Sequence, residues 1–117
     1  MKLTNIFENA ARLCGMAEDY YKNNDSSELS ARALTAINTV LFDLCEEEKH
    51  ESLLEEVPLS GAVFDAAVYG TAMYLSLAFG DTDKASFFSG VYGGKRAGVK
   101  SKSAAIADRL PKTEANR

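Results

Sequence analysis

The chain has 117 residues, of which 46% are hydrophobic, and it carries a formal net charge of −4. That length suits one domain with a modest core, and that hydrophobic fraction excludes a disordered chain. Only two prolines are present, which favours helices. Cys14 and Cys45 fit no zinc-binding spacing. With no secretory signal visible, we expect both to be reduced thiols on apolar helix faces of a cytosolic protein.

Two helices are predicted in the first half of the chain. The first begins near Thr4, which suits an N-cap, and Gly15 either ends this helix or lies within it. A polar loop over residues 22–27 precedes the second helix, which Asp25 or Ser27 caps. Its apolar residues recur every three or four positions and predict one broad buried face: Leu29, Ala33, Ala36, Ile37, Val40, Leu41, Leu44 and Cys45.

The most apolar segment, residues 62–79, predicts a central core helix. Ser60 is its expected N-cap, and Gly80 stands where a helix-terminating glycine belongs. Gly70 costs helix stability, so we expect it to mark a close helix crossing. The segment contains Asp65 and two tyrosines and lacks basic flanks, which argues against a membrane span.

A fourth helix is predicted to open at Asp81 or Thr82 and to stop at the pair Gly93 and Gly94. Residues 103–110 have a weak helical pattern closed by Pro111, which predicts a short fifth helix docked on a partner or a mobile segment. The expected fold is all-α: a four-helix bundle over residues 1–97 and a basic C-terminal tail over 98–117.

Charge is unevenly distributed along the chain. Residues 95–117 hold seven basic and two acidic residues, whereas residues 1–94 hold six basic and fifteen acidic ones. Glutamates are dense between residues 46 and 56, where we favour a solvated loop over a docking site for a basic partner. The opposed charges predict that the tail contacts an acidic surface, such as that of a neighbouring copy.

No catalytic, cofactor-binding or metal-binding constellation is evident, so we expect no enzyme activity. Asp81 and Asp83 resemble a DxD metal motif, but their position favours capping of a helix N-terminus. His50 is the only histidine and follows Glu46 by one helical turn. One histidine and one glutamate do not make a site, so we expect an exposed side chain there.

Four stretches carry a resemblance to a known family: IFENAARLCG, SARALTAINTVLFDL, YGTAMYLSLAFGD and KASFFSGVYGGKRA. Together with the basic tail, they resemble the head–tail connector (adaptor, neck) proteins of tailed bacteriophages and prophages, over about residues 4–97. The resemblance implies an all-α bundle that assembles as a homo-oligomeric ring between portal and tail proteins. It also implies a structural role in the virion, or in the host cytoplasm during assembly, without enzymatic activity or cofactors.

The end of the fourth helix and the tail hold the residues expected to contact partners: Phe88, Tyr92, Lys95, Arg96, Lys100 and Lys102. The cations also leave nonspecific contact with DNA phosphates open, although no aromatic residue interleaves with them. The alternative to a connector is a small helical protein-binding or regulatory module of phage or bacterial origin. Its groove would use Met73, Phe87, Phe88 and Tyr92.

Overall fold

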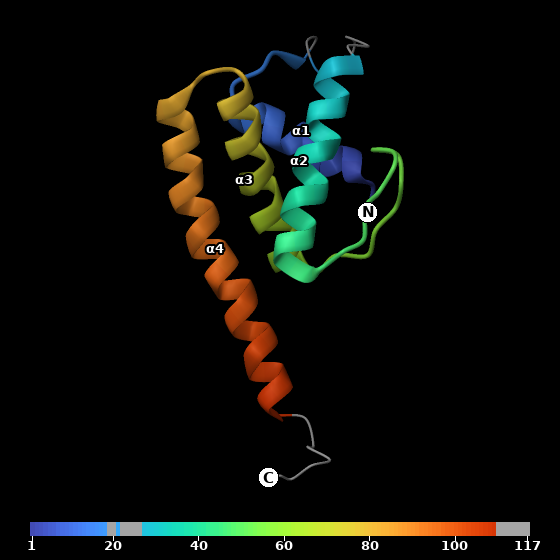
Figure 1. Cartoon of the computed structure of the whole chain (residues 1–117), viewed down its shortest axis with the longest axis vertical. Coiled ribbons are helices and arrows are strands. Elements are labelled where there is room, and N and C mark those ends of the chain that lie inside the picture. The colour runs from blue at the N-terminus through green and yellow to red at the C-terminus, as the bar shows by residue number, and fades with distance from the viewer. Residues whose placement is uncertain (19–20, 22–26, 110–117) are drawn as a thin grey trace.

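The computed structural model describes residues 1–18, 21 and 27–109, with the side chains of all of these except residues 27 and 103–109. Its helices are α1 (Leu3–Leu13), α2 (Ser27–Cys45), α3 (Gly61–Ala78) and α4 (Thr82–Arg109). α2, α3 and α4 run alternately down and up, and α1 crosses behind α3 and α2 (Figure 1). The predicted all-α class with four main helices is confirmed. Residues 22–26 of the predicted loop and residues 110–117 of the tail lie outside the described residues.

α3 is the central helix, as predicted, and it contacts each of the other three. Residues around most of its circumference are buried: Ala66, Ala67, Val68, Gly70, Thr71, Ala72, Leu75 and Ser76. A helix that is apolar nearly all round must be covered nearly all round, and this chain supplies the cover itself. One side stays open towards solvent, where Tyr74 and Leu77 are 38% and 52% exposed.

Gly70 lies at a close crossing, as its position in the sequence predicted. A Cβ atom added there would come within 2.9 Å of both the Tyr92 ring and the Val40 side chain. Real Cβ atoms do not approach neighbours that closely, so only glycine fits between α2 and α4 at this point. Glycine lowers the helix propensity of α3 at this position, but its missing side chain allows Tyr92 and Val40 to pack against the α3 backbone.

The two ends of α3 follow the expected capping chemistry, whereas the start of α1 does not. The Ser60 hydroxyl accepts a hydrogen bond from the Val63 amide, and Gly80 adopts a positive φ of 77° after α3. α1 begins at Leu3 rather than after Thr4, so the predicted Thr4 cap is wrong. Instead, carbonyls of the segment before α3 accept from the first amides of α1: Leu3 donates to Glu55 and Thr4 to Leu53. These bonds fix residues 53–57 against the start of α1.

The predicted helix end at Gly93 and Gly94 is wrong. α4 continues through both glycines to Arg109, so residues 98–109 extend this helix instead of forming a separate one. Its four glycines cost about 4 kcal/mol of helix propensity relative to alanine. Burial of apolar side chains on both sides of the pair, such as Phe88 and Val99, stabilises the continuous helix by about 1.5–3 kcal/mol each. Tertiary packing therefore overrides the local stop signal.

Among the described residues, no helix has both the length and the apolar character needed to cross a bilayer.

Candidate functional site

Two of the predicted partner contacts, Phe88 and Tyr92, lie on the face of α4 that packs against α3. They are only 5% and 9% exposed. Phe88 packs against Tyr69, with ring centroids 6.1 Å apart, and Tyr92 lies under Gly70. The exposed aromatic residue here is the neighbouring Phe87, at 65%. A contact between Phe88 or Tyr92 and a partner stays a prediction, and it would require access to a face that α3 covers.

The next predicted contact, Arg96, pairs with Asp43 of α2. Both Asp43 oxygens accept from the guanidinium, at 2.6 Å from Nε and 3.0 Å from Nη2. The Tyr92 hydroxyl donates to the same carboxylate at 2.6 Å. These two donors hold the pKa of Asp43 below its usual range, with Arg96 the stronger cause. Burial, followed by the hydrogen bond to Asp43, raises the pKa of Tyr92. The three residues therefore form one charged clamp between α2 and α4.

Lys95 forms a second clamp, from α4 to α3. Its ammonium group donates to the Asp65 carboxylate and lies 5.2 Å from the centre of the Tyr69 ring. The hydrogen bond to Asp65 raises the pKa of Lys95. Both predicted basic contacts of the helix end are thus paired within the chain. Their positive charge is largely neutralised by Asp65 and Asp43, so these two side chains attract DNA phosphates less than free cations would.

Lys100 and Lys102 follow the clamps in the sequence of α4, and the end of this helix extends past the bundle (Figure 1). Lys100 is half-buried and lines an open groove beside Asp43 and Glu46. Lys102 is exposed, and no ion pair is formed by its side chain within the described part of the chain. Of the predicted contacts, these two lysines are the ones that stay available to an acidic surface.

The groove at Lys100 has a volume of about 770 Å³ and lies between α2 and the part of α4 from Tyr92 to Lys100. Val40 and Tyr92 line it, and Phe42, 64% exposed, stands at its edge. Thr39 and Tyr74 also line a second hollow of about 500 Å³ between α2 and α3. The two hollows therefore run together along one side of α2. The sequence predicted a groove near α3 and α4, but of its four expected residues only Tyr92 lines this one.

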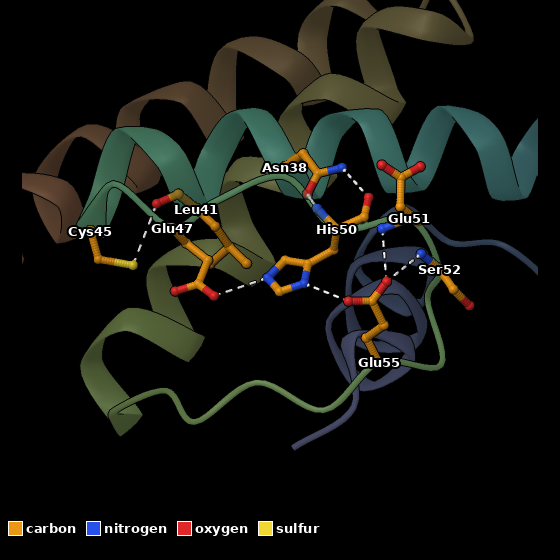
Figure 2. Close-up of polar contacts among 8 residues, drawn as sticks. All are labelled: Asn38, Leu41, Cys45, Glu47, His50, Glu51, Ser52 and Glu55. Atoms are coloured by element: carbon orange, nitrogen blue, oxygen red, sulfur yellow. Dashed lines mark hydrogen bonds and ion pairs between the residues drawn. The ribbon is translucent and has the colours of Figure 1, made fainter.

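His50 lies between two carboxylates and is not the exposed side chain that the sequence predicted. Its Nδ1 is 2.8 Å from Glu55 and its Nε2 is 3.0 Å from Glu47, and the side chain is 13% exposed (Figure 2). Glu46 adopts a positive φ of 56° after α2 ends, so it does not share a helical face with His50. The chain turns back at this point and brings Glu47 and Glu55 to the ring instead.

The His50 cluster also ties the segment to α2. Asn38 donates its side-chain amide to the His50 carbonyl at 3.0 Å and accepts from the His50 amide at 2.8 Å. The second Glu55 oxygen accepts from the amides of Glu51 and Ser52 (Figure 2). The hydrogen bond to Glu55 is the main cause that raises the pKa of His50. The polar groups of this cluster form hydrogen bonds with one another. The cluster therefore holds the chain between α2 and α3 in place.

The remaining chemical candidates are Asp81 and the two cysteines. The Asp81 carboxylate accepts from the Lys84 amide at 3.1 Å, which confirms capping at the DxD sequence. Burial raises the pKa of Cys14, so its thiol is a poor nucleophile at neutral pH. Cys45 is exposed, contrary to the expected apolar face. Within the described residues, no three His, Cys, Asp or Glu side chains gather as metal ligands would.

Exposed apolar side chains form the feature that sequence reasoning missed. The most exposed are Phe42, Leu54, Leu77, Phe79 and Phe87, each more than half accessible to solvent. Helical periodicity marks which face of a helix is apolar, and it would have placed Phe42 outside the buried stripe of α2. Leu77 and Phe79 lie near the turn between α3 and α4. Their exposure depends on how the two helices pack, which helical periodicity does not predict.

Comparisons of the chain with protein-family models, with curated protein sequences and with solved structures give no match.

Proposed function

We propose that this protein is a structural subunit of a tailed bacteriophage or prophage particle. It resembles a head–tail connector that forms a homo-oligomeric ring between portal and tail. The observation that carries the proposal is the length of α4. Its 28 residues extend for about 42 Å, against about 27 Å for the 18 residues of α3. The end of α4 leaves the bundle and is free to reach a neighbouring subunit (Figure 1).

The surface chemistry supports assembly of this kind. Closed rings use head-to-tail contacts, in which two different surfaces of the subunit meet. The exposed carboxylates Glu46, Glu48 and Glu51 oppose in sign the exposed Lys102 on α4. Exposed apolar side chains, such as Phe42 and Phe87, add area that loses water on association. In this role the protein is located in the virion, and in the host cytoplasm while particles assemble.

The test is the oligomeric state of the full chain, measured by native mass spectrometry over a rising concentration series. A ring-forming subunit yields a discrete oligomer, alone or when portal and tail proteins are added. A chain that stays monomeric throughout, with and without these components, would refute the proposal.

The alternative is a helical protein-binding module, and the groove along α2 is the observation that favours it. Deletion of residues 103–117 separates the two functions. The cut lies beyond Lys95, Arg96 and Val99, which pack against the bundle, so the fold should survive it. A connector would lose self-assembly, whereas a module would keep its affinity for a partner helix in the groove.

A further inference from the structure

The middle of α4 carries four glycines, at positions 90, 93, 94 and 98, that no contact with the described residues requires. A Cβ atom added at any of the four would meet no atom within 4 Å. Gly70 differs, because a Cβ there would collide with two neighbours. Glycine gives a helix its lowest propensity apart from proline, and it leaves the backbone free to adopt other conformations. This segment of α4 is therefore the part of the helix that bends most easily.

Both clamps attach α4 next to the central glycine pair. Tyr92 precedes Gly93, and Lys95 and Arg96 directly follow Gly94. Their acceptors are Asp43 on α2 and Asp65 on α3. The side chains of Arg96 and Asp65 are 45% and 53% exposed, so water and salt ions reach both pairs. Exposed ion pairs are individually weak and are screened by salt.

Beyond the clamps, few of the side chains that the structure describes hold the helix. Val99 is buried and Lys100 half-buried, whereas Gly98, Ser101 and Lys102 are exposed. A helical segment as short as residues 98–109 is marginal by itself in water, so its direction depends on contacts such as those of Val99 and Lys100.

We propose that Gly90–Gly98 is a hinge in α4 and that Asp43 and Asp65 are its latch. With the latch closed, α4 is straight and residues 99–109 keep one direction relative to the bundle. With the latch open, α4 bends at the glycines while its first turns stay packed through Phe88. The hinge depends only on contacts within one chain, so its test is independent of whether the protein forms the proposed ring.

The test measures the distance between a spin label on α2 and one beyond the hinge, by pulsed electron–electron double resonance on the full chain. Ser30→Cys and Ser101→Cys carry the labels, and Cys14→Ser and Cys45→Ser remove the native thiols. All four positions permit this, since Ser30, Ser101 and Cys45 are exposed and the Cys14 thiol makes only weak hydrogen bonds at 3.5 Å. The parent should give a narrow distance distribution. Asp43→Asn with Asp65→Asn should give a broad one.

Alanine at all four glycine positions should make the distribution narrow again in the Asp43→Asn, Asp65→Asn background, because alanine stiffens the helix and meets no neighbour. Glu48→Gln with Glu51→Gln is the matched control, which removes two exposed carboxylates outside the latch and should change nothing. If the Asp43 and Asp65 variant folds poorly, added salt of about 1 M on the parent should broaden the distribution by screening.

A distribution that stays narrow without both aspartates and in high salt would overturn the latch. A distribution that stays broad after the alanine substitutions would overturn the hinge.

Discussion

The ring of Tyr92 lies against the backbone of Gly70, at the point where α4 crosses α3. Atoms of the ring would lie 2.9 and 3.0 Å from a Cβ at position 70. The hydroxyl at the far end of the same side chain donates to Asp43 of α2. One residue of α4 thus connects three helices, and its position depends on the absence of a side chain at Gly70.

Gly70→Ala should destabilise the protein by about 1–2 kcal/mol, because the cost of overpacking exceeds the gain in helix propensity. Gly93→Ala is the matched control. Its Cβ meets no neighbour, so it should stabilise by about 0.5–1 kcal/mol. Urea unfolding followed by circular dichroism measures both changes. Equal stabilisation by the two alanines would show that the crossing has room for a methyl group.

Tyr92→Phe keeps the ring under Gly70 and removes only the hydroxyl. We expect a loss of about 1–2 kcal/mol, because a hydrogen bond to a charged group contributes somewhat more than the typical 1 kcal/mol and this carboxylate is partly exposed. The pKa of Asp43 should rise towards its ordinary value and stay below it, because the stronger cause, Arg96, remains. Urea unfolding and titration of the Asp43 carboxyl by nuclear magnetic resonance measure the two effects. An unchanged stability would mean that water replaces the hydroxyl without loss.

Thr71 is buried, and its hydroxyl has no hydrogen-bond partner among the described residues. Thr71→Val replaces this hydroxyl with a methyl group of similar shape, and it should stabilise the fold by about 1 kcal/mol since no buried polar group remains unpaired. Thr35→Val on the exposed side of α2 is the control and should have little effect. Thermal unfolding of both variants provides the comparison. A destabilised Thr71→Val would indicate that the hydroxyl has a partner in solution.

The pKa of His50 should lie above its ordinary value of about 6.5. The protonated ring is stabilised mainly by Glu55, so the stabilisation is complete below about 6.5 and is lost as pH rises through the folded-state value. The pKa of Glu55 is lowered, chiefly by His50, so its contribution is lost only at acidic pH. The segment between α2 and α3 should therefore be most stable between these limits.

Because His50 is the only histidine, its ring signals can be titrated by nuclear magnetic resonance without assignment. His50→Gln should remove the loss of stability between neutral and mildly alkaline pH. A measured pKa at or below 6.5 would contradict the arrangement with two carboxylates.

Phe87→Ser tests whether the exposed aromatic residue of α4 takes part in assembly. Its side chain is 65% exposed, so the unfolding free energy should change by less than about 0.5 kcal/mol. Self-association should weaken about tenfold or more if the ring becomes buried between subunits. Analytical ultracentrifugation measures the association and urea unfolding the stability. Phe88→Ser is the contrasting variant, which should unfold the bundle because Phe88 is buried.

The sequence by itself determined the class of fold and the central position of α3. Helical periodicity places the apolar residues of α2 on one face, and a helix apolar nearly all round has no stable place except the centre. Short-range chemistry also determined the Ser60 cap, the turn at Gly80 and the cap at Asp81. These features depend on residues within one or two turns of each other.

Tertiary structure alone decided the length of α4 and the environment of the charged side chains. Gly93 and Gly94 are a local stop signal, but packing against α3 and pairing with Asp43 and Asp65 outweigh it. His50 is enclosed because the chain reverses after Glu46 and brings Glu55 back to it. Such pairs join residues five to about fifty positions apart outside any single helix, so no periodic pattern in the sequence reports them.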